Sequence, residues 1–329
     1  MADPLRRRVR ARLLFGLTHG SALVPGPLQD AAFATAAALV RRGRLGTLAR
    51  ENLLQALGDE LDEVTRERVL RDCFHHSSRL LRNWMRLARS APPDGPRASR
   101  GAWIDDAVTI DPSITILNEV LSRGRGALVV TAHIGDWELM VAAVRRLGHH
   151  GAVVGLQRPR DPSADWPVAM RRAYGVRTIP QDASPRRLLE VLHGGGVLGL
   201  VTDLEVRRLD GEFLPFLGRP ALTMTAPAAL ARAARVPLVP MRCVARGPGR
   251  WDHVLSVEEP LALDTSLPRR EATSDLLLRM NQTFERWIRE TPEQWAWHQN
   301  RWRTAPGEYD AVPLEERHRR NRERREAGR

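Results

Sequence analysis

The sequence predicts an α/β fold, in which a mostly parallel sheet is flanked by helices and preceded by an N-terminal helical segment. From residue 107 onward, short apolar runs alternate with amphipathic stretches, which is typical of strands alternating with helices. Residues 47–90 instead repeat their apolar side chains with a helical period. A stretch rich in Pro and Gly, 90–101, separates the two patterns. We therefore expect a helical, membrane-associating segment at 1–100, a main domain at 101–305 and a disordered, Arg- and Glu-rich tail at 306–329.

The expected elements of the main domain follow from this alternation. After a short apolar segment at 107–110, we expect strands at 127–132, 152–156, 176–179, 197–201 and 237–244, with 252–258 as a further candidate. We expect helices at 114–122, 136–147, 165–174, 184–193, 225–235 and 272–290. The run 127–131 is apolar and rich in β-branched residues, as in strands that are buried on both faces. The last helix carries its apolar side chains on one face and ends before Pro292.

The N-terminal segment combines arginines with apolar residues. Several arginines between residues 6 and 12 precede Leu13, and Pro25 and Pro27 interrupt the apolar segment 13–40. This segment is shorter than the roughly 20 continuous apolar residues that a membrane-spanning helix needs. Two helices lying on an anionic bilayer are one interpretation, and an ordinary soluble pair of helices is the other.

The composition excludes several classes of chemistry. All 51 basic residues are Arg, and without Lys the chain can build no Schiff base, pyridoxal-phosphate site or P-loop. Cys73 and Cys243 lie far apart, which predicts neither a disulfide framework nor a metal site. The net charge of +12 indicates an anionic partner. We expect no nucleic acid, because no recognition module accompanies the charge.

The stretch 127–140 reads as strand, turn and helix, and it carries the main candidate site. His133 lies at the carboxyl end of the expected strand, Asp136 is a candidate N-cap and Glu138 falls in the first helical turn. The turn allows the helix to aim the Glu138 carboxylate at the imidazole, and such a pair can take a proton from a hydroxyl group. Alternatively, a backbone carbonyl satisfies His133, and the two acids only favour the start of a helix. The spacing does not decide between these interpretations.

Other motifs add one candidate and exclude three sites. Asp203 follows the buried run 197–201, at a strand end where parallel sheets form their sites, although it could also be a cap. The chain has no G-x-S-x-G and no H-E-x-x-H, which excludes an α/β-hydrolase site and this kind of zinc site. The G-x-G-x-x-G match at 194–199 follows a helix and opens a strand, the reverse of a dinucleotide site.

Five segments together resemble one family. They are Thr131-Ala-His-Ile-Gly-Asp-Trp-Glu-Leu139, Arg171-Arg-Ala-Tyr-Gly-Val176, Gly195-Gly-Val-Leu-Gly-Leu-Val-Thr-Asp203, Phe213-Leu-Pro-Phe-Leu-Gly-Arg-Pro220 with Thr223 and Thr225, and Pro292-Glu-Gln-Trp-Ala-Trp-His298 with Arg301 and Trp302. In this order they resemble the lauroyl/myristoyl acyltransferases of bacterial lipid A biosynthesis, which are related to phosphatidylinositol mannoside acyltransferases and, more distantly, to glycerophosphate acyltransferases.

The resemblance implies a glycerophosphate-acyltransferase-like fold and a set of site residues. It assigns His133 and Glu138 to a catalytic dyad and Arg171, or its neighbour Arg172, to the stabilisation of the oxyanion. It assigns a substrate-binding role to Asp203, Arg158, Gly218, Arg219 and Thr223. No metal and no cofactor are implied, and acyl carrier protein or acyl-CoA supplies the acyl group.

The resemblance also implies a function. The protein would move an acyl group from a thioester to a hydroxyl of an anionic lipid, a lipid A precursor, at the cytoplasmic face of the inner membrane. One alternative keeps the chemistry but uses acyl-CoA and a phosphatidylinositol mannoside or another glycolipid or phospholipid. A second alternative is a basic membrane- or nucleic-acid-binding protein built on an inactive transferase scaffold.

Overall fold

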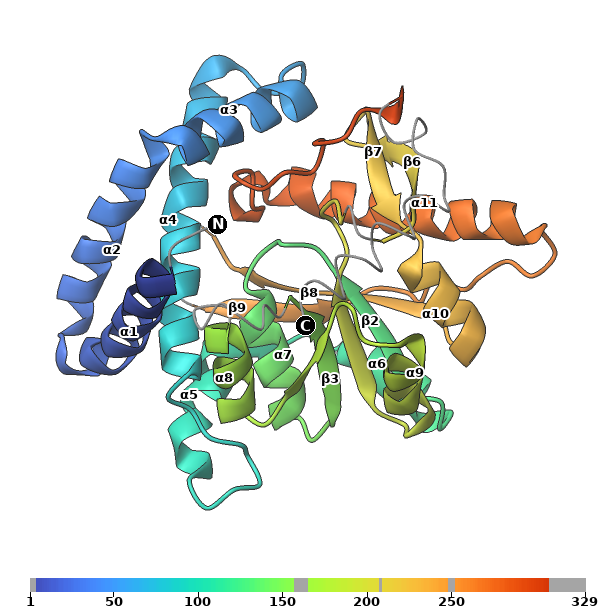
Figure 1. The fold of residues 1–329 in the computed structure, drawn as a ribbon, viewed down its shortest axis with the longest axis horizontal. Coiled ribbons are helices and arrows are strands. Elements are labelled where there is room, and N and C mark those ends of the chain that lie inside the picture. Colours follow the sequence, from blue (N-terminus) through green and yellow to red (C-terminus); the bar gives the residue numbers. More distant parts are fainter. Residues whose placement is uncertain (1–3, 157–164, 207–208, 248–251, 308–329) are drawn as a thin grey trace.

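A seven-stranded sheet forms the centre of the protein (Figure 1). The structure, a computed structural model, describes residues 4–156, 165–206, 209–247 and 252–307. The strand order is β1-β9-β8-β2-β5-β3-β4. β9 runs antiparallel to β8, and the other neighbouring strands pair in parallel. The predicted fold class, a mostly parallel sheet flanked by helices, is therefore confirmed.

The strands lie within a residue or two of their expected positions. Their bounds are Val108–Ile110 for β1, Ala127–Thr131 for β2, Gly151–Gly155 for β3, Arg177–Pro180 for β4, Val197–Val201 for β5, Leu238–Ala245 for β8 and His253–Val257 for β9. β2 is buried along its whole length, as its apolar sequence predicts. It lies between β8 and β5, so the loop after β2 emerges at the middle of the sheet.

Successive side chains of β2 point to opposite faces of the sheet. Leu128 and Val130 join an apolar cluster with three helices, and Val129 joins the cluster on the other face. The helices of the first face are α9 (Pro185–His193), α10 (Ala226–Ala234) and α11 (Arg269–Glu290). Those of the second face are α5 (Trp103–Ala107), α6 (Ile114–Ser122), α7 (Trp137–Arg146) and α8 (Trp166–Ala173). These helices bury both faces of the sheet.

Four N-terminal helices lie at one side of the sheet (Figure 1). They are α1 (Pro4–Gly20), α2 (Gly26–Arg41), α3 (Arg44–Leu57) and α4 (Glu63–Leu87). The short 3₁₀ turn η1 (Ser21–Leu23) and Pro25 separate α1 from α2, as the interrupted apolar segment predicts. α4 connects this group to the sheet, since Phe74 belongs to one core cluster and Met85 to the other. Among the described helices, none has the length and apolar content that crossing a bilayer requires.

A separate hairpin of β6 (Gly211–Phe216) and β7 (Arg219–Met224) is the main element that the sequence does not predict. The strands pair antiparallel and place Pro215 opposite Pro220. Proline argues against a strand because it removes a donor, and this explains why the pattern fails here. Leu217 and Gly218 both have positive φ angles and form the tight turn between the strands. The hairpin packs on α11.

Candidate active site

The register of the sheet brings two distant polar residues together. Thr131 at the end of β2 pairs with Val201 at the end of β5, and the two strands run in parallel. His133 lies two residues after Thr131, and Asp203 lies two residues after Val201. Their side chains therefore meet at the carboxyl edge of the sheet, where parallel sheets form their sites.

The Asp203 carboxylate holds His133 through both its backbone and its ring. Oδ1 lies 2.7 Å from the imidazole Nδ1, and Oδ2 accepts a hydrogen bond of 2.8 Å from the His133 backbone N–H. The indole N–H of Trp295 donates to the same Oδ2 at 2.7 Å. Asp203 is fully buried. Burial alone would raise the pKa of this carboxyl, but the His133 charge and the three donors outweigh it and lower the pKa below its usual value.

This pairing defines which ring nitrogen can react. With a carboxylate at Nδ1, the neutral imidazole carries its proton on Nδ1, and Nε2 is the nitrogen that can accept a proton. The His133 side chain keeps 23% of its surface exposed and lines a cavity of about 310 Å³. The cavity is also lined by Leu80, Leu81, Trp84, Trp137, Ser77 and His298. The arrangement can therefore take a proton from a group that enters a largely apolar space.

Contacts with α4 and β8 fix the loop that carries His133. Gly135 has a φ of 58°, and a Cβ at this position would lie 2.0 Å from the backbone oxygen of Cys243, so only glycine fits. His76 on α4 contacts the Gly135 backbone oxygen through Nε2 at 3.1 Å. Asp136 caps α7 by accepting from the backbone N–H of Leu139 at 3.0 Å, as predicted. These contacts fix the backbone of the loop that carries His133.

The expected pairing of His133 with Glu138 requires a correction, because the carboxylate at the imidazole is that of Asp203. Glu138 is 2% exposed and bonds instead to residues of α8 and its end. The Nε of Arg171 donates to both Glu138 oxygens at 3.1 and 3.0 Å, and the Tyr174 hydroxyl donates to Oε2 at 3.0 Å. The first turn of α7 faces α8, so its carboxylate meets a guanidinium rather than the ring five residues before it.

The Glu138–Arg171 ion pair is buried. Burial alone would lower the pKa of the Arg171 guanidinium, but the Glu138 charge raises it above its usual range. Burial raises the pKa of the Tyr174 hydroxyl well above its usual value, so this group stays protonated and donates. Arg171 and Glu138 line a narrow space beside Trp137 and do not line the cavity at His133.

The remaining predicted substrate-binding residues that the structure describes belong to the β6–β7 hairpin. Arg158 falls outside the described residues, as does the tail from residue 308. Gly218 forms the turn of the β6–β7 hairpin, and Arg219 bonds to Gln55 and stacks on the Trp302 ring. Thr223 is 1% exposed, and its hydroxyl is engaged in hydrogen bonds within the hairpin and with neighbouring side chains. In this structure these residues hold the hairpin, and their substrate-binding role stays a prediction.

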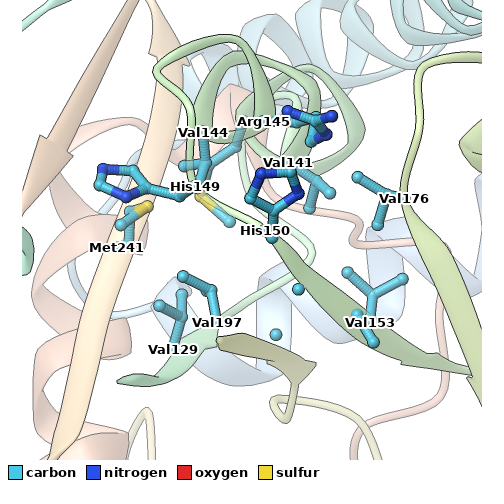
Figure 2. A pocket seen from close by; sticks show the side chains of 14 residues that line it. Val129, Val141, Val144, Arg145, His149, His150, Val153, Val176, Val197 and Met241 are labelled. Atoms are coloured by element: carbon cyan, nitrogen blue, oxygen red, sulfur yellow. The ribbon is translucent and has the colours of Figure 1, made fainter. Parts of the chain in front are cut away.

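A second space lies between α7 and the sheet (Figure 2). Figure 2 shows Val129, Val153 and Val197 below it and Val141 and Val144 above it. Its volume is about 40 Å³, and His149 and His150 lie at its rim. It is lined by none of His133, Asp203 and Glu138. This apolar space is therefore separate from the cavity at His133.

The fold and the site define a class: an α/β protein with a carboxylate-bound imidazole at the carboxyl edge of a parallel sheet. A profile of the bacterial lipid A biosynthesis acyltransferases matches residues 6–304, and the chain belongs to this family. This confirms the resemblance seen in the sequence.

A curated relative agrees with the family. The chain is 27% identical over 195 residues to the lipid A biosynthesis lauroyltransferase of Escherichia coli (strain K12). The match covers 58% of this chain and 60% of that relative. The chain thus spans about three fifths of the length of the curated protein that it matches.

Sequence reasoning missed two residues that contact the site. The segment around Trp295 carries the family resemblance, but nothing in its pattern indicates that the indole bonds to Asp203. The contact of His76 with the Gly135 oxygen depends on how α4 packs. In both cases the sequence distance exceeds 50 residues, so no local pattern could have found the contact.

Proposed function

We propose that this protein is an acyltransferase that moves a fatty acyl group from a thioester to a hydroxyl of a lipid A precursor. We assign the role of general base to His133 and the role of its orienting carboxylate to Asp203. The observation that carries the proposal is the hydrogen bond between these side chains at the wall of an apolar cavity. Family membership supports the reaction class and the lipid acceptor.

The proposed reaction follows from the tautomer that Asp203 imposes. Nε2 of His133 takes the proton of the acceptor hydroxyl, and the oxygen attacks the thioester carbonyl. The new C–O bond forms a tetrahedral intermediate, which collapses as the C–S bond breaks. The departing thiolate takes the proton back from the imidazolium, and the Asp203 carboxylate stabilises that cation in the meantime. Oxyanion stabilisation by Arg171 stays a prediction, since its Nε is held by Glu138.

The donor is proposed to be an acyl group on an acidic carrier protein. The net charge of +12 and the planar guanidinium groups of an all-Arg basic set favour anionic partners. Acyl-CoA carries the same thioester and is also anionic, so the two donors have to be separated by experiment. An experiment must likewise decide whether the acceptor is a phosphorylated glucosamine lipid or another anionic glycolipid.

The decisive experiment removes the base. The purified His133→Ala variant should lose roughly a hundredfold to ten-thousandfold in transfer rate. The rate is measured as thiol release from lauroyl acyl carrier protein and from lauroyl-CoA, each with a lipid A precursor as acceptor. His149→Ala is a matched control, because this histidine lies at the rim of the other space and should keep the wild-type rate.

Equal rates for wild-type protein and the folded His133→Ala variant would contradict the proposal. A preference of at least tenfold for one donor, measured in the same assay, assigns the acyl carrier. Replacing the lipid A precursor by a phosphatidylinositol mannoside tests the alternative acceptor, which is supported if only that lipid is acylated.

The N-terminal helices are proposed to bind the membrane surface without crossing it. Most exposed large apolar side chains of the described residues lie between Val9 and Leu54. On α1, Val9, Leu13 and Leu17 are exposed and spaced four residues apart, so they share one face of the helix. The other face is anchored, because the Trp166 indole donates to the Thr18 hydroxyl at 2.9 Å. An exposed apolar face on a basic protein is typical of interfacial helices.

The double variant Leu13→Ser and Leu17→Ser tests this mode of attachment. We expect binding to anionic vesicles to fall about tenfold or more, since two apolar side chains no longer enter the interface. Sedimentation with vesicles of phosphatidylglycerol and phosphatidylethanolamine measures it. Leu147→Ser and Leu267→Ser form the control, because these side chains are also exposed but lie outside the N-terminal helices. Unchanged sedimentation of the first variant would contradict an interfacial role of α1.

A further inference from the structure

The segment after α11 runs across the carboxyl edge of the sheet, and we call residues 292–304 the C-terminal strap. The backbone N–H of Gly135 donates to the Gln294 oxygen, and the backbone N–H of Ala296 donates to the His133 oxygen, both at 3.0 Å. Ile134 and Trp295 form an antiparallel bridge between these two contacts. The strap therefore adds a short strand-like pairing to the loop that carries His133.

The strap is also fixed at its own ends. The Gln294 side chain donates to and accepts from the backbone of Ala245 at the end of β8, at 3.0 and 2.8 Å. The backbone N–H and the hydroxyl of Thr304 bond to the Glu205 carboxylate in the loop after β5. The strap thus connects the loops that follow β2, β5 and β8.

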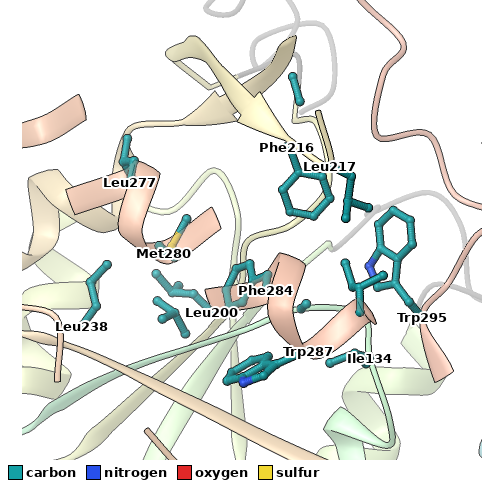
Figure 3. Packing of buried hydrophobic residues seen from close by; sticks show 14 of the residues in the cluster. Ile134, Leu200, Phe216, Leu217, Leu238, Leu277, Met280, Phe284, Trp287 and Trp295 are labelled. Carbon is teal, nitrogen blue, oxygen red and sulfur yellow. The ribbon is translucent and has the colours of Figure 1, made fainter. Parts of the chain in front are cut away.

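Trp295 is the residue of the strap that reaches the reactive pair. It is 1% exposed, and its ring packs against Phe216 and edge-on against Trp297, with ring centroids 5.9 and 4.6 Å away. Figure 3 shows the indole beside Leu217 of the hairpin turn. Packing on several sides fixes the ring, so its N–H has one direction, which is toward Asp203 Oδ2.

We infer that Trp295 is a positioning residue for the reaction: its indole N–H fixes the Asp203 carboxylate and, through it, the imidazole of His133. This inference rests on the proposed function of the His133–Asp203 pair. Oδ2 accepts from the indole and from the His133 backbone, which leaves Oδ1 directed at the imidazole Nδ1. Without the indole donor, the carboxylate is held on one side only, and the direction of Nε2 in the cavity is less well defined.

The indole N–H also affects the charge balance of the pair. Its positive end faces the carboxylate, so its removal leaves more negative charge beside the imidazole and favours the imidazolium. The acidic limb of the rate profile, which reports protonation of the base, should then move to higher pH. Among the described residues, Arg301 acts electrostatically on Asp203 and His298 acts on His133, and neither group is changed by a substitution at Trp295.

The test compares two tryptophans of the strap. In Trp295→Phe a smaller aromatic ring replaces the indole and the N–H is lost, and we expect kcat to fall about tenfold or more with little change in KM. Its acidic limb should shift to higher pH. Trp297→Phe is the matched control, since Trp297 is equally buried and donates to the Pro292 backbone oxygen instead of Asp203. It should keep the wild-type kcat and pH profile.

The outcomes separate the inference from the proposed function. If His133→Ala and Asp203→Asn are inactive while Trp295→Phe matches Trp297→Phe in kcat and pH profile, Trp295 has no positioning role. If His133→Ala and Asp203→Asn keep wild-type rates, the proposed function itself is wrong. Should Trp295→Phe fail to fold, benzothienylalanine at position 295 removes the N–H while keeping the size of the indole. The same loss of kcat and pH shift are then expected.

Discussion

Asp203 and Glu138 are two buried carboxylates at the same edge of one sheet, yet they have different partners. Asp203 bonds to an imidazole and an indole beside a cavity. Glu138 bonds to a guanidinium and a phenol hydroxyl on α8. A guanidinium stays protonated at any ordinary pH, whereas an imidazole gains and loses its proton near neutrality. Only the Asp203 pair can therefore change its charge during a reaction.

The comparison shows that a short distance in sequence does not select the carboxylate that bonds to an imidazole. Glu138 is five residues from His133, but the helix that carries it turns toward α8. Asp203 is 70 residues away, and the parallel register of β2 and β5 brings it next to the ring. Glu138 instead forms a buried ion pair with Arg171, which joins the start of α7 to α8.

The largest effect should come from the carboxylate that holds the imidazole. Asp203→Asn keeps the size of the side chain but places an amide at Nδ1, which no longer stabilises the imidazolium and favours the wrong tautomer. We expect the rate of thiol release to fall roughly a thousandfold. Asp182→Asn, at an exposed position after β4, is the control and should stay within about threefold of wild type. A fall of similar size in both variants would contradict a specific role of the Asp203 carboxylate.

The second variant acts on the other carboxylate and should affect stability. Glu138→Gln leaves the buried Arg171 guanidinium without its counter-charge, so the free energy of unfolding should fall by about 3–5 kcal/mol. The residual activity should keep the wild-type pH profile, because His133 retains its own carboxylate. Urea unfolding and the pH dependence of kcat/KM measure these two quantities.

A double variant sharpens this prediction. In Glu138→Gln with Arg171→Met no buried charge is left unpaired, and the loss of stability should be smaller than in Glu138→Gln alone. Equal stability of wild-type protein and the single variant would contradict a structural ion pair. If the acidic limb of the pH profile shifts in Glu138→Gln, Glu138 acts on His133 after all.

A smaller effect should come from the histidine whose partner is a backbone oxygen. Burial lowers the pKa of His76 to about 4, and an unfolded histidine titrates near 6.5. Between these values the unfolded chain binds a proton that the folded protein does not, so stability falls as the pH falls from 6.5 to 4. The loss is at most about 3 kcal/mol.

The variant His76→Gln removes this titration and keeps a donor for the Gly135 oxygen. Its free energy of unfolding should therefore decrease less than that of wild-type protein between pH 7 and pH 4.5, as measured by urea unfolding at both values. Parallel decreases would show that His76 does not contribute to the pH dependence. The comparison separates an imidazole that is only structural from His133, whose charge change serves the proposed reaction.

Most of the fold could be predicted from local patterns. β5 and α6 begin and end at the expected residues, and the cap by Asp136 was visible in the sequence. The β6–β7 hairpin was not, since prolines in both strands conceal it. Of the site, His133 and Asp203 were found as separate residues at strand ends, but their contact was not.

The sequence by itself determined which residues end the strands, where the helices begin and which family the chain resembles. These features depend on side chains that are a few residues apart, so the sequence shows their spacing directly. Only the tertiary structure decided that β2 lies beside β5, that α7 faces α8 and that the C-terminal strap crosses the edge of the sheet. Strand order and helix orientation minimise the free energy of the whole core, so the partners of His133 and Glu138 could not be read from the residues around them.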